Sequence, residues 1–191
     1  QRQMCIRDRV WRLHEVLSKA RPAELVLCGE YVMKRISKDA YYLEIAQAVS
    51  QRSTCLKRRY GAVIVKNDEI IATGYNGAPR GETNCCDIGS CKRLDKPSNS
   101  GDYSDCHSVH AEQNAIISAS RSEMLGSTMY LYGEQLEYFP CCPPGTKLET
   151  AVHPVWTQIT VPEPCPICRR MIANAGIIRV VTLDKCSDDA D

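Results

Sequence analysis

Two short motifs, far apart in the chain, place the strongest constraint on its fold. Cys165 and Cys168 lie in PCPIC at the start of one predicted helix, and His110 lies in VHAEQ at the start of another. A Cys-x-x-Cys spacing at a helix start lets two thiolates reach one metal ion. Two cysteines and one histidine leave the fourth corner of a zinc tetrahedron open for water, which distinguishes catalytic from structural zinc. We therefore expect the fold to bring together residues that are 55 positions apart.

Glu112 follows two positions after His110 in the second motif. On a regular helix, side chains at i and i+2 do not face each other. In the first turn the backbone N–H groups are unpaired, so both side chains can lean over the helix end into one pocket. Alternatively, His110 and Glu112 are solvated at a helix N-terminus, where the helix dipole favours a glutamate. Cys-x-x-Cys alone also fits a redox pair or half of a zinc finger, but the two motifs together favour a metal site beside a carboxylate.

Composition limits the class of protein. With 191 residues, 43% of them hydrophobic and 25% charged, the chain is expected to form one soluble globular domain with additions. The net charge of +1 argues against a general nucleic-acid binder. No segment approaches the roughly 20 apolar residues of a membrane span, and no early apolar run resembles a signal peptide. We expect a cytoplasmic protein with reduced thiols, so the 12 cysteines favour metal ligation over disulfides.

Hydrophobic periodicity predicts a mixed α/β domain over residues 38–185. The predicted helices are 38–52, 110–121 and 165–175, the last closed by Gly176, and the predicted strands are 61–65, 69–75, 129–133 and 177–183. The first two strands should form a hairpin. Residues 1–37 are interpreted as an N-terminal helical extension, the proline-rich stretch of about 134–163 as an insertion, and 186–191 as a flexible acidic tail.

Several stretches together resemble the deoxycytidylate (dCMP) deaminase family of the cytidine-deaminase superfamily. They are STCLKRRYGAVIV, GYNGAPRG, VHAEQNAI and PCPICRRMIANAG, and the resemblance covers about residues 38–183. H-x-E followed by P-C-x-x-C is the signature of zinc nucleobase deaminases. The resemblance implies an α/β fold, a three-layer α/β/α sandwich with a central mixed sheet. It also implies hydrolysis of dCMP to dUMP and ammonia, with Glu112 as catalytic acid/base and zinc held by His110, Cys165 and Cys168.

The resemblance also implies contacts beyond the metal. Asn76 of GYNG matches an asparagine that contacts the sugar, and the main chain near Ala111 should read the pyrimidine. Arg80 and Arg121 are candidates for phosphate or effector contacts, because a planar guanidinium suits phosphate, although exposed arginines are often only solvated. The basic run 57–59 is interpreted as a surface patch, with phosphate binding as the alternative. Relatives are commonly homo-oligomers, hexamers or dimers, with dCTP and dTTP as effectors.

Cysteine residues could also order the long loop between residues 77 and 109 by binding a metal ion. By the resemblance, four cysteines match the ligands of a second, structural zinc: Cys55, Cys85, Cys91 and Cys106. Cys86 or His107 could replace one of them, and the alternative is a set of thiols without metal. A bound ion would order the loop as a wall of the substrate pocket.

The insertion at 134–163 lengthens the usual separation between the two zinc motifs. Its Cys141, Cys142, His153 and Trp156 fit a further metal or base-stacking element, but we favour a surface excursion or an oligomer contact. Two other functions stay open. One is a deaminase of another cytosine or adenine substrate, namely a nucleoside, tRNA or single-stranded nucleic acid. The other is a zinc-stabilised binding module with a vestigial pocket.

Overall fold

The computed structural model describes residues 35–94, 96, 103–140 and 152–185, without the side chains of residues 139, 140, 152 and 153. Most of the predicted N-terminal extension, the predicted acidic tail and the middle of the insertion therefore lie outside the described residues. Cys141 and Cys142 belong to this part.

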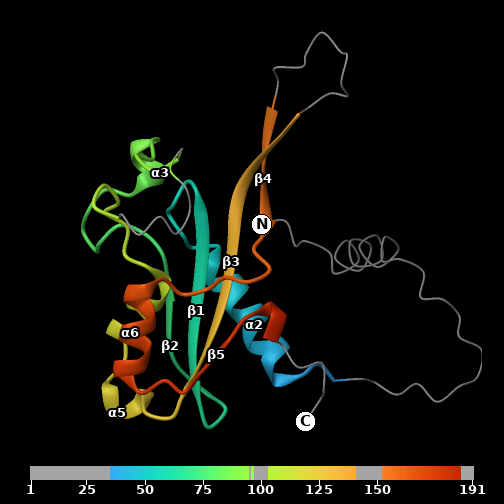
Figure 1. The fold of residues 1–191 in the computed structure, drawn as a ribbon, viewed down its shortest axis with the longest axis vertical. Helices are drawn as coiled ribbons and strands as arrows, with labels where there is room; N and C mark the ends of the chain where they lie inside the picture. The colour runs from blue at the N-terminus through green and yellow to red at the C-terminus, as the bar shows by residue number, and fades with distance from the viewer. Residues whose placement is uncertain (1–34, 95, 97–102, 141–151, 186–191) are drawn as a thin grey trace, which may run out of the picture. The chain divides into compact units, whose positions relative to one another are not determined.

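One mixed sheet forms the centre of the described region. Its order is β2-β1-β3-β4, with antiparallel neighbours throughout: β2 (Glu69–Tyr75), β1 (Arg58–Lys66), β3 (Thr128–Pro140) and β4 (Val152–Gln158). The short strand β5 (Arg179–Val181) runs parallel to the first residues of β3. In Figure 1, β3 and β4 continue together beyond the ends of β1 and β2 as a two-stranded arm.

The hairpin of β1 and β2 confirms the sequence prediction. Lys66 pairs with Glu69, so only Asn67 and Asp68 form the turn. Both turn residues have positive φ values, 52° and 67°, as a type I′ turn requires. Asn and Asp tolerate this conformation better than most residues, which explains why a two-residue turn forms here.

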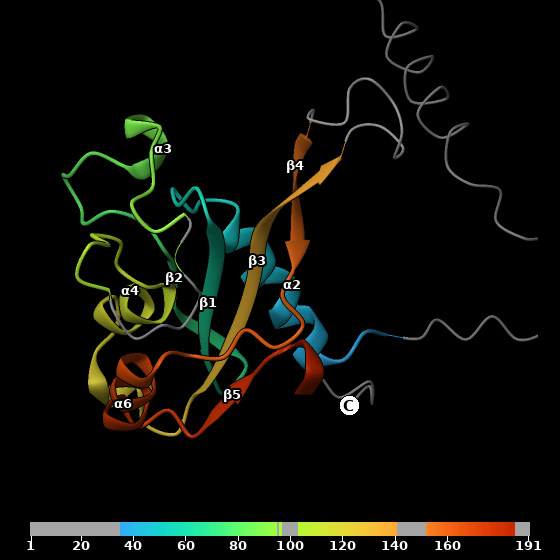
Figure 2. The same ribbon diagram turned by 45° about the horizontal axis from the view of Figure 1, so that its top comes forward.

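Helices cover both faces of the sheet and confirm the predicted three-layer α/β/α fold. Figures 1 and 2 show α2 (Lys38–Ser50) on one face, with α4 (Ala111–Ile117) and α6 (Pro166–Ala175) on the other. The short elements are α3 (Cys85–Ile88), α5 (Arg121–Met124) and the 3-10 helix η1 (Leu183–Lys185). None of the helices in the described part is long and apolar enough to cross a membrane.

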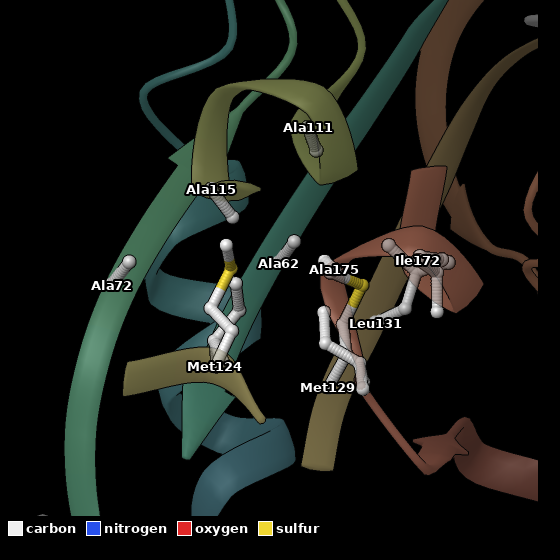
Figure 3. Close-up of a cluster of buried hydrophobic side chains, with 11 residues drawn as sticks. Ala62, Ala72, Ala111, Ala115, Met124, Met129, Leu131, Ile172 and Ala175 are labelled. Atoms are coloured by element: carbon white, nitrogen blue, oxygen red, sulfur yellow. The ribbon is translucent and has the colours of Figure 1, made fainter. Parts of the chain in front are cut away.

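Alternation along the central strands builds two hydrophobic cores. Val63 and Val65 pack toward α2, whereas Ala62 and Ile64 pack on the opposite face. Such a period of two is the natural result of an extended backbone, and a strand that is buried on both faces is apolar throughout. Figure 3 shows this opposite-face core, where Ala115 of α4 lies near Met124, Ala62 and Ala72, and Ala175 of α6 lies near Met129 and Leu131 of β3. The small side chains on and beneath α4 let this helix lie close to β1 and β2.

The largest differences from the sequence predictions are two changed boundaries and one additional strand. The helix predicted for 110–121 ends at Ile117, because Ser120 caps a separate short helix and forms a capping box with Glu123. The strand predicted for 129–133 is β3, which continues to Pro140. Its partner β4 was not predicted at all. β4 lies at the edge of the sheet and contains Pro154, and prolines are tolerated on edge strands although they usually argue against a strand.

Gly74 and Gly61 allow helix backbones to touch the sheet directly. A Cβ atom on Gly74 would overlap the Ala111 carbonyl oxygen and the Ala115 nitrogen of α4. A Cβ atom on Gly61 would overlap the backbone of α2 in the same way. Glycine is required at both positions for close approach rather than for an unusual φ. The distance between β2 and α4 therefore depends on Gly74.

We predict that Gly74→Ala lowers the free energy of unfolding by about 1–3 kcal/mol, because α4 must move to accommodate the added methyl group. Thr73→Ala, at an exposed position of the same strand, is the matched control and should cost less than about 1 kcal/mol. Denaturant unfolding of both variants measures the difference. Equal stability of the two variants would contradict the close packing of β2 against α4.

Candidate metal centre and pocket

The structure brings together the three side chains of the two sequence motifs at the starts of α4 and α6. His110 Nδ1 lies 3.6 Å from Cys165 Sγ and 3.5 Å from Cys168 Sγ. The ligand atoms of all three residues lie within 4.8 Å of one another. Within the described residues, no other group of three His, Cys, Asp or Glu side chains meets this criterion.

Local sequence explains why both helices begin at metal-ligand residues. Cys165 is the N-cap of α6 with an extended backbone, and its Sγ accepts a hydrogen bond from the Cys168 nitrogen at 3.4 Å. Pro166 occupies the first turn, where its missing N–H costs nothing. His110 is the N-cap of α4, and its backbone nitrogen donates to Gln113 Oε1 at 2.9 Å. Each helix start is therefore fixed by its own cap before any metal binds.

Glu112 lies in the first turn of α4 and is only 5% exposed. Burial raises the pKa of its carboxyl group. Burial also raises the pKa of the Cys168 thiol, and the neighbouring Glu112 carboxylate raises it further. Two buried thiols beside a buried carboxyl group cannot all ionise at neutral pH without a positive partner. A zinc ion supplies such a partner, and two sulfurs with one imidazole fit its preferred ligands.

A pocket opens above this cluster. Its wall includes His110, Ala111, Glu112, Cys165 and Asn76, all of which the sequence analysis had selected. The sequence analysis did not select Tyr60, Tyr103, Arg93, Ser108 and Glu163, which also line the pocket. Arg93, Tyr103 and Glu163 lie outside the stretches that carry the family resemblance, whereas Tyr60 lies within one of them.

The Asn76 side chain is already used to fix the start of β1. Its Oδ1 accepts hydrogen bonds from the Ser53 hydroxyl at 2.7 Å and from the Tyr60 nitrogen at 2.8 Å. Its Nδ2 donates to the Arg58 carbonyl oxygen at 2.9 Å. Contact with a bound sugar would therefore use the second N–H of the same amide. Asn76 joins the end of β2 to the wall of the pocket.

Tyr103 connects the long loop to the metal-binding histidine. Its ring meets the His110 ring edge-on, with the centroids 5.1 Å apart. On its other side, the Arg93 guanidinium lies 4.5 Å from the Tyr103 centroid, a distance typical of a cation–π contact. His110, the N-cap residue of α4, therefore also packs its imidazole ring against the loop.

The basic run 57–59 is not a uniform surface patch. The Lys57 ammonium donates to the carbonyl oxygens of Arg93 and Lys96 and holds the loop. Arg58 lines the pocket. Arg59, the next residue of the strand, lies 3.9 Å from the Trp156 ring centroid and is not part of the pocket wall. Successive strand residues point to opposite faces, so one position separates a pocket residue from a residue of the other face.

Two predicted contact residues lie elsewhere. Arg80 is exposed and does not line this pocket. Arg121 also lies outside the pocket wall, and its Nε donates to the Asn174 carbonyl oxygen at 3.1 Å, near the end of α6. A guanidinium at a helix C-terminus satisfies carbonyl groups that lack intrahelical partners. The structure thus gives Arg121 a role in joining α5 to α6.

The cysteines of the long loop gather beside the same pocket. Cys55, Cys91 and Cys106 line it, and Cys85 Sγ lies 3.9 Å from His107 Nε2. Burial raises the pKa of the Cys55 and Cys85 thiols, and thiolates of the other cysteines raise it further. These sulfurs are neighbours, but they are less compact than the cluster around His110. Cys86 is exposed, with its thiol donating toward Asp87.

Comparison with known proteins agrees with this geometry. Residues 36–184 match the family model of the cytidine and deoxycytidylate deaminase zinc-binding region. The deoxycytidylate deaminase of Mycobacterium phage D29 is 35% identical over 155 residues, which are 78% of this chain and 96% of that protein. The deoxycytidylate deaminase of Schizosaccharomyces pombe is 44% identical over 108 residues, 56% of this chain, and the match spans only 33% of that longer protein.

A solved structure also resembles the chain. It is the dCMP deaminase of cyanophage S-TIM5 in complex with dCMP and dUMP, with 28% sequence identity and a TM-score of 0.47. The match covers 74% of this chain and 76% of that chain. A TM-score of this size does not establish a shared fold, so the three-layer assignment rests on the sheet and helices described above.

Proposed function

Because this chain belongs to the cytidine and deoxycytidylate deaminase zinc-binding family, we propose that it is a zinc-dependent dCMP deaminase, which converts dCMP and water to dUMP and ammonia. The observation that carries the proposal is the position of Glu112. Its buried carboxyl group lies in the same pocket wall as two of the three metal-ligand residues, His110 and Cys165. A metal centre with an adjacent acid/base group is the arrangement that hydrolytic deamination of a cytosine ring requires.

The chemistry divides between the metal and this chain's own groups. When bound, zinc lowers the pKa of a water molecule from about 15.7 toward 7, which provides hydroxide at neutral pH. His110, Cys165 and Cys168 would hold the ion. Glu112 takes a proton from the attacking water and delivers it to N3 of cytosine, which makes C4 electrophilic. The water oxygen bonds to C4. Glu112 then takes the remaining proton of that hydroxyl and passes it to the amine, so that the C4–N4 bond breaks, ammonia leaves and C4 becomes a carbonyl.

Arg58 supports a phosphorylated substrate over a nucleoside. It lines the pocket and is half-buried, and within the described part of the chain no carboxylate lies within ion-pair distance of it. By contrast, Arg169 and Arg179 pair with Glu163 and Asp39 at 2.5 Å each. A guanidinium whose charge is not neutralised at a pocket wall is a suitable phosphate site. Nucleic acid fits less well, because the chain has a net charge of only +1.

A substrate panel tests the proposed function. We expect ammonia release from dCMP by the zinc-loaded protein, with a kcat/KM at least about tenfold above that for deoxycytidine, since the loss of one charge-assisted contact costs 1.4 kcal/mol or more. dCTP and tRNA complete the panel. Turnover of tRNA without turnover of dCMP would transfer the assignment to a nucleic-acid deaminase.

Glu112→Gln separates an enzyme from a vestigial binding module. The amide keeps the shape of the side chain but cannot move protons, so we expect unchanged zinc content and a loss of turnover of about 10²–10⁴-fold. Glu44→Gln, at an exposed position of α2, is the matched control and should keep full activity. Elemental analysis and ammonia release measure the two quantities. Full activity of Glu112→Gln would refute the acid/base role.

The loop cysteines support a second, structural zinc as part of the same proposal. Cys55, Cys85, Cys91 and Cys106 would close its coordination, with His107 beside Cys85 as an alternative ligand. Four thiolates or three thiolates and an imidazole are typical of structural sites. The ion would order the loop that carries Arg93 and Tyr103 against the pocket.

Zinc stoichiometry tests the second site. We expect about two zinc ions per chain in the intact protein, and about one in Cys85→Ser, because a structural site that loses a thiolate binds far more weakly. Cys86→Ser is the matched control, since the Cys86 side chain is exposed, and it should keep both ions. One zinc per chain in the unmodified protein would refute the structural site.

Two further properties implied by the family resemblance are assembly into dimers or hexamers and regulation by dCTP and dTTP. The cytoplasmic location expected from the sequence belongs to the same proposal.

A further inference from the structure

The two-stranded arm of β3 and β4 is linked to one pocket residue, Arg58, by a side chain at its base. The arm consists of Leu136–Pro140 in β3 and 152–156 in β4, beyond the end of β1, and Gln135 is the residue of β3 that precedes it. In the sheet, Gln135 lies directly opposite Arg58 of β1. Directly opposed residues in an antiparallel pair place their side chains on the same face. Gln135 therefore lies on the face of the sheet that carries the pocket.

Two neutral groups hold the Arg58 guanidinium in place. One nitrogen donates to the Tyr60 hydroxyl at 3.0 Å, and the other donates to Gln135 Oε1 at 3.1 Å. A phenol and an amide accept hydrogen bonds without neutralising the positive charge. These two bonds use two of the five N–H donors of an arginine, so three remain for a ligand. The guanidinium is fixed in direction and keeps its charge.

Glu137 fixes the orientation of the Gln135 amide. Gln135 Nε2 donates to Glu137 Oε1 at 2.6 Å. The carboxylate needs a donor and the guanidinium needs an acceptor, so only one orientation of the amide satisfies both. The Gln135 carbonyl oxygen therefore faces Arg58. The amide therefore lies between the Glu137 carboxylate and the Arg58 guanidinium. Among the described residues, no carboxylate, including that of Glu137, lies within ion-pair distance of this guanidinium.

We infer that Gln135 is a positioning residue that directs the Arg58 guanidinium toward the phosphate of the substrate, so that the β3–β4 arm determines selection of a phosphorylated ligand. The inference rests on the proposed function and extends it, because the arm lies in the insertion that separates the two zinc motifs. A glutamine at this position orients the cation, whereas a carboxylate would neutralise it.

Steady-state kinetics with dCMP and deoxycytidine test the inference. We expect the KM for dCMP to rise ~10-fold in Gln135→Ala, which loses a hydrogen bond to a charged group. The rise should be larger, ~30-fold or more, in Gln135→Glu, because the new carboxylate pairs with Arg58 and repels phosphate. In both variants kcat with dCMP and the KM for deoxycytidine should stay within about twofold of the intact protein, since neither depends on phosphate binding. Gln158→Ala, at an exposed position of β4, should leave all values unchanged.

The contrast between the two substrates excludes a merely structural role. Gln135→Glu also places a carboxylate beside Glu137, so a structural disturbance predicts a higher KM for both dCMP and deoxycytidine, whereas the inference predicts a rise for dCMP alone. Unchanged KM values for dCMP in both variants, or equal rises for dCMP and deoxycytidine, would overturn the inference while turnover of dCMP left the proposed function intact. If the intact protein does not turn over dCMP, the proposed function fails. Calorimetric binding of dUMP and of deoxyuridine then decides the inference, with loss of affinity for dUMP alone as the supporting result.

Discussion

The close approach of two helix N-termini over one face of the sheet is the constraint on which the rest of the site depends. His110 at the start of α4 and Cys165 at the start of α6 share a site because α4 lies low against β1 and β2 and packs against α6. The residues beneath α4 are small: Gly74 has no side chain, and Ala62 and Ala72 add little volume. Close packing of the hydrophobic core and positioning of the chemical groups are therefore one requirement rather than two.

Strand alternation then distributes charge between the two faces. Arg58 and Arg59 are adjacent in the chain, but one faces the pocket and the other contacts Trp156 on the arm. A shift of register by one residue would exchange them, and it would also exchange the two sets of core residues in β1. Because Val63 and Ile64 are buried on opposite faces, such a shift would raise the free energy of the folded state. Hydrophobic packing in the middle of the strand thus controls the direction of an arginine at its beginning.

Much of the fold could be predicted from the sequence because its signals are local. The hairpin around Asn67, the glycine stop after α6 and the convergence of His110 with Cys165 each follow from short patterns. The break between α4 and α5 also had a local signal, a serine three positions before a glutamate, which the longer apolar pattern obscured. Where a motif and a periodicity disagreed at this boundary, the motif was the better guide.

The rest of the site could not be predicted because it depends on contacts between distant segments. Tyr103 and Gln135 come from the long loop and from β3 and belong to no quoted motif, and although Arg58 lies in the basic run 57–59, the run alone did not distinguish it from Lys57 and Arg59. β4 was missed for a different reason. Pro154 argued against a strand in the sequence, and a proline is tolerated in β4 because this strand lies at the edge of the sheet.

That edge position has a consequence for how the molecule meets its neighbours. An outermost strand normally offers a row of unpaired N–H and C=O groups to which a strand of another molecule can add. Pro154, exposed near the middle of β4, interrupts this row, because it has no N–H to donate. Pro154 therefore disfavours a continuous ladder between β4 and a strand of another molecule.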